Sequence, residues 1–194
     1  MTQNGKALLQ IRDLAVEFST DDGIVKAVNG VAYDVPAGHA IGIVGESGSG
    51  KSVSQLAVMR LIARPAGRIT RGEVIFDGAD LLGTNESDMR QIRGNRISMI
   101  FQDPMNSLNP VYTVGRQIEE ALRLHEGASK SEAHARAIEL LDLVGIPSPE
   151  DRVKDYPHQL SGGMQQRAMI AMAIACNPES VSYTHLTLPT SDLV

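Results

Sequence analysis

Short apolar runs separated by turns dominate the first part of the chain, a pattern that is typical of strands. Residues 8–18 mix β-branched and alternating apolar positions and predict one strand, and residues 24–35 predict two more after a turn at 20–23. Residues 40–44 form a compact apolar run after the turn at 36–38, and they predict a strand buried in a parallel sheet. A β layer that leads into a buried strand is therefore expected.

Helical periodicity begins behind this run, and helices and strands alternate from there on. Apolar residues at helical spacing predict a helix over 53–62, which Pro65 and Gly67 then interrupt. Ser129 and Glu132 form the pattern of a helix capping box. The further predicted elements are strands at 72–78 and 96–102, a short helix at 85–93, a loop at 103–110, and helices at 113–125, 130–144 (closed by Gly145) and 164–175.

The composition fits one medium-sized domain, with 194 residues of which 42% are hydrophobic. The net charge is −5 and the isoelectric point about 5.5, so no surface that coats nucleic acid is expected. Cys176 is the single cysteine, which excludes a disulfide framework, and it is expected to be an inert residue at a helix end. No run approaches the roughly 18 apolar residues of a membrane span. Any work at a membrane is expected to depend on a partner.

The stretch from Gly45 to Ser52 reads G-E-S-G-S-G-K-S and matches the P-loop pattern G-x-x-x-x-G-K-S. Its glycines let the backbone curl until successive N–H groups point at one spot, and the following helix adds its positive dipole end. Lys51 is expected to reach the β- and γ-phosphates, and Ser52 to ligate Mg²⁺. The sequence predicts a nucleotide site formed by Gly45, Glu46, Ser47, Gly48, Ser49, Gly50, Lys51 and Ser52.

A second candidate anion site lies where Ser161, Gly162 and Gly163 open an apolar helix. Serine is a good N-cap, and the two glycines present N–H groups that no Cβ atom obstructs. Gln102 ends a predicted core strand, where it could touch a metal or water or simply terminate the strand. Phe18 could stack on a purine or belong to the core. Both alternatives are open at this point.

Three stretches, taken in order, resemble the nucleotide-binding subunit of an ATP-binding cassette (ABC) transporter. They read G-E-S-G-S-G-K-S, F-Q-D-P-M-N-S-L-N-P and L-S-G-G-M-Q-Q-R, and they occur at the spacing of that family. The second and the extended third, Y-P-H-Q-L-S-G-G-M-Q-Q-R-A-M-I-A-M-A, are similar to the oligopeptide/dipeptide/nickel importer branch. The resemblance covers about residues 8–179.

This resemblance implies a role for each matching stretch. Residues 45–52 would be the Walker A motif that binds ATP and Mg²⁺, and Gln102 would be the Q-loop glutamine that senses Mg²⁺ and the γ-phosphate. Residues 160–165 would be the signature motif. Two cassettes of this family pair head to tail, so Ser161 and Gly163 would contact the γ-phosphate held by Lys51 of the second cassette.

The resemblance also implies an architecture and partners. The fold would be an α/β P-loop NTPase (ABC ATPase) core with an antiparallel β layer and an inserted helical subdomain at about 104–157, incomplete at the C-terminus. The partners would be a second cassette, identical or homologous, two transmembrane permease subunits and an extracytoplasmic solute-binding protein that delivers cargo. The place of action would be the cytoplasmic face of the membrane, and the work would be ATP-driven uptake of peptides or a related small solute.

The chain departs from the family after Glu179. An apolar strand ending in Asp-Glu is expected there, whereas Thr184 and His185 occupy the corresponding positions. Residues 180–194 resemble a translated sequencing adapter, and we therefore expect a partial domain over 1–179 followed by a non-native tail. The tail has strand-forming residues that could partly fill the slot. Poor folding, weak nucleotide binding and no ATP hydrolysis are expected for the chain as it stands.

Two other classes of protein carry a P-loop and remain as alternatives. A non-transport ABC protein that acts on ribosomes or DNA would be expected to have tandem cassettes or long coiled coils, and neither occurs in this sequence. A small-molecule kinase would not be expected to carry L-S-G-G. An inert fragment that binds nucleotide without turnover is the interpretation favoured for the literal 194 residues.

Overall fold

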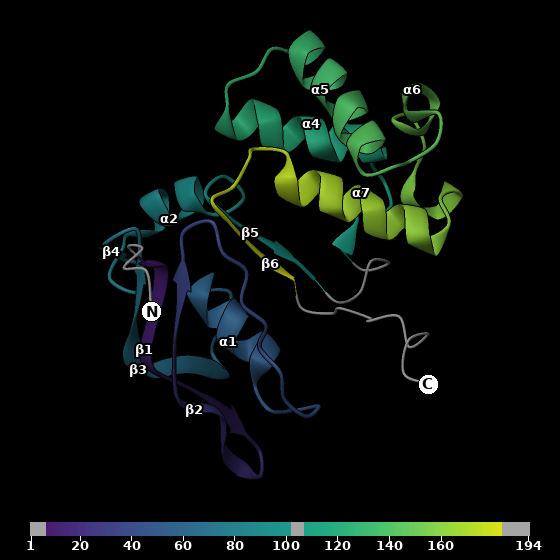
Figure 1. Ribbon diagram of the computed structural model, residues 1–194. Helices are drawn as coiled ribbons and strands as arrows, with labels where there is room; N and C mark the ends of the chain where they lie inside the picture. Colours follow the sequence, from purple (N-terminus) through teal and green to yellow (C-terminus); the bar gives the residue numbers. More distant parts are fainter. Residues whose placement is uncertain (1–6, 102–106, 184–194) are drawn as a thin grey trace, which may run out of the picture. The chain divides into compact units, whose positions relative to one another are not determined.

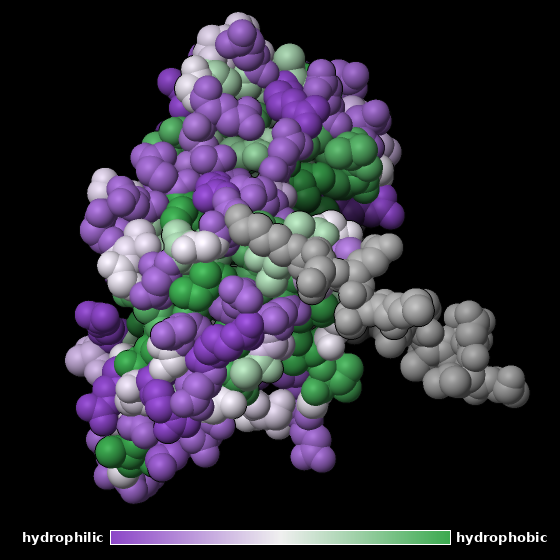
Figure 2. Space-filling model, turned by 60° about the vertical axis from the view of Figure 1, so that its left-hand side comes forward, coloured by the Kyte–Doolittle hydropathy of each residue, from purple (hydrophilic) through white to green (hydrophobic). Residues whose placement is uncertain are grey.

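The computed structural model describes residues 7–101 and 107–183, and the chain divides into two compact units. The first unit runs over Met1–Met89 and the second over Arg90–Val194. The first holds the antiparallel sheet and the first helix, and the second holds most of the helices (Figure 1). Figure 2 shows one face of the molecule, on which groups of hydrophobic residues lie among hydrophilic ones.

The sheet of the first unit has the strand order β2-β1-β3-β4, and every neighbouring pair is antiparallel. The strands are β1 (Ala7–Thr20), β2 (Gly23–Pro36), β3 (Gly67–Phe76) and β4 (Ala79–Asp80). The strand predicted at 8–18 is confirmed. The two strands predicted at 24–35 form a single one, because shifts in the β1–β2 register absorb the irregularities and the pairing continues beyond them.

One face of this sheet and the helix α1 (Lys51–Val58) make the core of the first unit. Alternation along β1 directs side chains to this face, and Val74 and Phe76 of β3 join them without any exposure. The buried apolar residues are Leu9, Ile11, Leu14, Ala15, Val16, Val28, Ala57, Val58, Met59, Val74, Phe76, Leu81 and Met89. The helix is thus fixed against the sheet by apolar contact.

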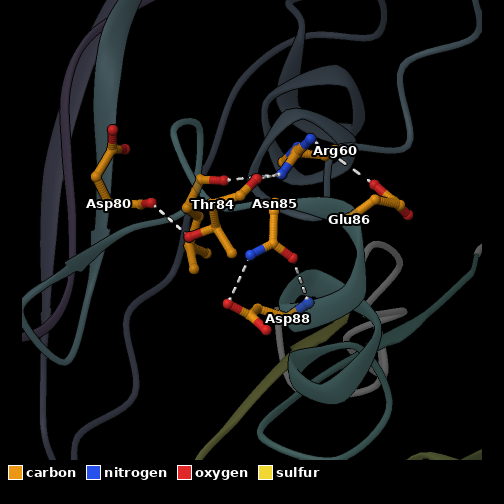
Figure 3. Close-up of polar contacts among 7 residues, drawn as sticks. Arg60, Asp80, Thr84, Asn85, Glu86 and Asp88 are labelled. Carbon is orange, nitrogen blue, oxygen red and sulfur yellow. Dashed lines mark hydrogen bonds and ion pairs between the residues drawn. The ribbon is translucent and has the colours of Figure 1, made fainter.

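The helix predicted over 53–62 ends earlier, at Val58. Met59 caps it, and Arg60 then adopts a left-handed backbone conformation with φ 53°. The Arg60 guanidinium donates to the carbonyl of Thr84 and to that of Leu81, the latter at 3.3 Å, and it lies 3.7 Å from the Glu86 carboxylate. Figure 3 shows Arg60 pointing at Thr84 and Glu86. These contacts stop the helix and anchor its end.

The segment that receives Arg60 is itself ordered by short-range hydrogen bonds (Figure 3). The Thr84 hydroxyl donates to the Asp80 carbonyl at 2.7 Å. Asn85 accepts from the Asp88 backbone N–H and donates to the Asp88 carboxylate, both at 2.9 Å, at the start of helix α2 (Glu86–Ile92). The predicted short helix at 85–93 is confirmed.

The strand predicted at 40–44 is absent, and this prediction is wrong. No residue of that run is assigned to a strand, and Val44 is 97% exposed while Ile41 and Ile43 are 41% and 40% exposed. A parallel strand needs backbone partners beside it. Within the described residues of the first unit, the sheet pairs only β1 to β4 and offers this run no partner.

The second unit has a two-stranded parallel sheet and a group of helices. Strand β5 (Ile97–Ile100) pairs with β6 (Ser180–Tyr183), in register from Ile97 opposite Ser180 to Ile100 opposite Tyr183. The helices are α4 (Val114–His125), α5 (Lys130–Leu143), α6 (Pro149–Arg152), the 3-10 turn η1 (Pro157–Gln159) and α7 (Gly162–Ile174). The expectation that the tail partly fills a strand position is confirmed for residues 180–183.

A single hydrophobic cluster holds this unit together. It joins Ile100 of β5, Ile118 and Leu122 of α4, Leu140 of α5 and Met169 of α7, all nearly or fully buried. Tyr183 of β6 packs against the same cluster, and its hydroxyl pairs with the amide of Gln166. No helix in the described part of the chain is long and apolar enough to span a bilayer.

The predicted helix signals in this unit are confirmed. Ser129 and Glu132 form the capping box in both directions, at 3.3 Å and 2.9 Å, and these hydrogen bonds lower the pKa of the Glu132 carboxyl. Gly145 closes α5 with φ 74°. Cys176 is 7% exposed, and burial together with the charge of Glu126 raises the pKa of its thiol to about 11. The cysteine is therefore inert, as expected.

Candidate nucleotide-binding site

The P-loop is wrapped around the ammonium group of Lys51. Its Nζ donates to the carbonyl oxygens of Gly45 at 2.6 Å and Glu46 at 2.7 Å, and it lies 3.3 Å from the Ser49 hydroxyl. The Ser49 N–H also donates to the Glu46 carbonyl at 3.2 Å, which closes the turn. A positive charge is thus held at the centre of the loop, where an anion can reach it.

Two glycines make this loop possible. Gly50 has φ 87°, and a Cβ atom there would lie 2.2 Å from the carbonyl oxygen of Ala27 on β2. Gly48 has φ 80° with open space around it. Both conformations are costly for residues with a side chain. The loop therefore packs directly against β2 at Gly50. At Gly48 the glycine is needed only for the positive φ of the turn.

The N-terminus of α1 lies at the end of this loop and carries no side-chain cap. The first N–H groups of a helix have no partner inside it, so those at Lys51, Ser52 and Val53 face outward as donors. Together with the Lys51 ammonium they fit the phosphate groups of a nucleotide. The Ser52 hydroxyl is exposed in the first turn, where it fits the role of a Mg²⁺ ligand.

Contacts with β2 fix the direction of α1. Gln55 donates to the Tyr33 hydroxyl at 2.8 Å, and Ser54 is 3% exposed and donates to the Lys51 carbonyl at 2.7 Å. Burial raises the pKa of the Tyr33 hydroxyl. Helix α1 is thereby tied to β2.

The second predicted anion site is a capped helix start in the second unit. The Ser161 side chain accepts from the Met164 N–H at 3.4 Å, and α7 begins at Gly162. A Cβ atom at Gly162 or Gly163 would meet no atom of the described residues within 4 Å, the helix's own nearby backbone aside. The described neighbours therefore leave open space in front of both glycines, and the predicted contact of this helix start with an anion remains a prediction.

Phe18 and Gln102 are predicted site residues that lie outside both glycine-rich helix starts. Phe18 is half-buried at the end of β1, and its ring lies over Gly67, where a Cβ atom would be 2.7 Å from the ring. It contributes to packing there, and stacking on a purine remains a prediction. Gln102 lies outside the described residues, so its predicted role at the Mg²⁺ also remains a prediction. Across the residues that are described, no group of three or more His, Cys, Asp or Glu side chains could hold a metal ion.

Comparison with known families identifies this architecture. The family model described as ABC transporter matches residues 28–181, which include both glycine-rich helix starts. The chain belongs to the ABC transporter family. The expected α/β P-loop fold is thereby confirmed, and the family supports ATP binding.

Curated relatives of this ABC protein are ATP-binding proteins named for peptide transport. A probable peptide ABC transporter ATP-binding protein of Sinorhizobium fredii is 53% identical over 181 residues, which are 92% of this chain and 54% of the relative. The oligopeptide transport ATP-binding protein OppD of Bacillus subtilis is 54% identical, over 89% of this chain and 48% of its own length. The dipeptide transport ATP-binding protein DppD of Escherichia coli is also 54% identical, over 89% and 53%. The chain spans about half the length of these relatives.

Solved cassettes have the same fold. A bacterial ABC transporter cassette with a dimeric structure is 29% identical and superposes with a TM-score of 0.80, over 90% of this chain and 72% of that one. The same cassette in a dimeric post-hydrolysis state bound to ADP and Pi gives the same values. The resemblance of the sequence motifs to ABC transporter cassettes is confirmed at the level of the family, and the curated relatives with similar sequences are named for peptide transport.

Proposed function

We propose that this chain is the ATP-binding part of an ABC importer subunit that couples ATP binding and hydrolysis to uptake of peptides or a related small solute. The observation that carries this proposal is the P-loop, in which the Lys51 ammonium lies inside the loop beside an uncapped helix N-terminus. The relatives named for peptide and dipeptide transport support the cargo class.

The proposed binding step uses the chain's own groups. The Lys51 ammonium moves from the carbonyl oxygens of Gly45 and Glu46 to the β- and γ-phosphates, and the N–H groups of the first turn of α1 donate to them. Ser52 and Gln102 would hold Mg²⁺, which would neutralise part of the phosphate charge. Phe18 stacks on the adenine at the end of β1.

The proposed switch is a pair of cassettes. Ser161, Gly162 and Gly163 of one cassette donate to the γ-phosphate at the P-loop of a second, identical or homologous cassette, so ATP joins the two. The dimeric state of a solved relative supports this arrangement. Two transmembrane permease subunits and an extracytoplasmic solute-binding protein complete the importer, and the cassettes work peripherally at the cytoplasmic face of the membrane.

We also propose that the 194-residue chain does not hydrolyse ATP by itself. In this family an Asp and a Glu at the end of the strand after the signature helix support Mg²⁺ and activate water, and Thr184 and His185 stand there in this sequence. Residues 1–179 are a partial nucleotide-binding domain, and 180–194 are a non-native tail. Resequencing of the source DNA across the codon for Glu179 tests the origin of the tail: a reading frame that continues into an apolar run ending in Asp-Glu supports it, and an encoded stop after Val194 contradicts it.

Titration with a fluorescent ATP analogue tests the binding half of the proposal. The chain is expected to bind it, and Lys51→Ala is expected to weaken binding by about 1.5–3 kcal/mol, the value of a charged hydrogen bond. Lys130→Ala, at the exposed start of α5, is the matched control and should bind like the parent. Equal binding by the Lys51→Ala protein, or ATP turnover that Lys51→Ala abolishes, would contradict the proposal for this chain.

A chimera tests the transport half. Residues 1–179 replace the matching segment of the Escherichia coli dipeptide transport ATP-binding protein, whose remaining length then supplies what this chain lacks. The chimera is expected to restore growth of an auxotroph on a dipeptide, and the same chimera with Lys51→Ala is not. A chimera that accumulates at the membrane and binds ATP but does not restore uptake would argue against the importer role.

A further inference from the structure

Gln165 is a buried amide directly behind the start of α7. It is 8% exposed and is one of three buried polar side chains in the described chain, with Ser54 and Ser98. Its Nε2 donates to the carbonyl oxygen of Pro157 at 2.7 Å and to that of Leu160 at 3.2 Å. The sequence gives no sign of a separate role for this residue, because its partners are backbone atoms.

The same residue also holds the next carbonyl along the chain. The Gln165 backbone N–H donates to the Ser161 carbonyl at 2.9 Å, so one residue fixes the two consecutive carbonyl groups of Leu160 and Ser161. A peptide unit is planar and trans, and its N–H points away from its C=O. Fixing these carbonyls therefore fixes the directions of the N–H groups of Ser161 and Gly162.

The loop before α7 also has hydrogen bonds and a ring contact of its own. The Gln159 side chain accepts from the Tyr156 N–H at 2.7 Å, and the Leu160 N–H donates to the Pro157 carbonyl at 3.1 Å. The Tyr156 and His158 rings stack with centroids 5.7 Å apart. The Gln165 amide lies inside this turn and ties its first and last carbonyl groups to the helix.

The side-chain amide of Gln165 is hydrogen-bonded through its nitrogen but not through its oxygen. The Gln165 Oε1 is buried and has no hydrogen-bond partner among the described residues, and an unpaired buried acceptor lowers stability. An apolar side chain of similar length would avoid this cost but would lose both donated hydrogen bonds. The glutamine therefore contributes two donated hydrogen bonds, which hold the carbonyl groups of Pro157 and Leu160 in place.

We propose that Gln165 is a positioning residue for the signature loop: it presets the N–H groups of Ser161 and Gly162 for the γ-phosphate of ATP bound by the second cassette. This proposal rests on the proposed function of the signature. Because the loop is already ordered before the two cassettes meet, association loses less conformational entropy, and the affinity between the cassettes is higher. Binding of ATP to the P-loop of a single cassette does not use it.

The test is Gln165→Met in the 194-residue chain, because methionine keeps the length of the side chain and removes both donated hydrogen bonds. The matched control is Gln117→Met, since the Gln117 amide also donates to backbone carbonyl groups in a different loop, those of Asn109 at 3.1 Å, Tyr112 at 3.0 Å and Thr113 at 3.5 Å. Three quantities are measured: ATP-driven self-association by analytical ultracentrifugation with EDTA present, binding of a fluorescent ATP analogue at low protein concentration, and amide hydrogen exchange over 157–165.

Gln165→Met is expected to raise the dissociation constant of the ATP-bound dimer about tenfold, as the loss of a charged hydrogen bond would. Amide exchange at Ser161 and Gly162 should become faster. Binding of the ATP analogue should stay like that of the parent, which a general loss of structure would not allow, while the lost hydrogen bonds lower the thermal midpoint of both glutamine variants. Gln117→Met should leave self-association unchanged.

Ser161→Ala separates failure of this proposal from failure of the proposed function. If Ser161→Ala weakens ATP-driven association and Gln165→Met does not, the positioning role of Gln165 is wrong while the role of the signature stands. If neither substitution changes association, the proposed role of the signature is wrong and the positioning role with it. Equal weakening by Gln165→Met and Gln117→Met would also overturn the proposal, because the effect would then be a general one.

Discussion

Arg96 and Glu179 form an ion pair, with 2.5 Å between the Arg96 Nε and a Glu179 carboxylate oxygen, at the start of two parallel strands. Each residue directly precedes its strand, β5 or β6, and the Ser180 N–H donates to the Arg96 carbonyl at 3.2 Å. The ion pair therefore sets the register in which residues 180–183 join the sheet.

Glu179→Gln is expected to lower the free energy of unfolding by less than about 1 kcal/mol, because both side chains are more than a third exposed and water screens the pair. Urea unfolding at low and high salt measures this. The loss should shrink at high salt, and Glu139→Gln, which breaks the exposed pair with Arg136, is the control. A loss of several kcal/mol would mean that this contact stabilises the sheet and does more than align it.

Gly50→Ala and Gly48→Ala are expected to differ although both glycines have a positive φ. At Gly48 only the left-handed conformation costs free energy, roughly 1–2 kcal/mol. At Gly50 the Cβ atom would also lie 2.2 Å from the Ala27 carbonyl oxygen, which adds an overpacking cost of about 1–3 kcal/mol. Urea unfolding of both variants should therefore show the larger loss for Gly50→Ala, and equal losses would contradict the packing of the loop on β2.

Local signals were predictable from the sequence because their partners lie a few residues away. The capping box of Ser129 and Glu132 and the cap at Ser161 each involve residues three positions apart, and the structure has both. The P-loop follows from Gly48, Gly50 and Lys51 for the same reason. Such features need no knowledge of the rest of the fold.

Features that depend on distant partners were not predictable in this way. The apolar run at 40–44 has the composition of a buried strand, but a strand forms only where a neighbour offers hydrogen bonds. The early end of α1 depends on Arg60 meeting carbonyl groups and a carboxylate that follow it by more than twenty residues. The side chain of Gln165 donates to backbone carbonyl groups, which every residue type has, so the sequence does not reveal these hydrogen bonds.

The thiol of Cys176 is expected to make stability depend on alkaline pH. Burial raises its pKa to about 11 in the folded chain, from an ordinary 9.0. The folded state thus keeps the proton that the unfolded state loses first, so this contribution to stability is complete below pH 9 and is lost as the pH rises towards about 11. The free energy of unfolding, measured with urea at several pH values across this range, should therefore fall less steeply with pH in Cys176→Ala than in the parent. An equally steep fall in both proteins would contradict this prediction. Alkylation at about pH 8 should likewise be slow until the chain unfolds.

Gly163→Ala is expected to raise stability while it lowers ATP-driven association. The added Cβ atom meets no atom of the described residues within 4 Å, the helix's own nearby backbone aside, and Gly163 does not have a positive φ, so the substitution mainly reduces the freedom of the unfolded chain, a gain of about 0.4–1 kcal/mol. The same methyl group occupies the space through which a phosphate would reach the N–H groups of the α7 start. Gly42→Ala is the control, because Gly42 has equally open surroundings outside both helix starts. It should gain stability and keep association. A Gly163→Ala chain that is stabilised and still associates with ATP as tightly as the parent would show that the space at the start of α7 is not filled by a ligand.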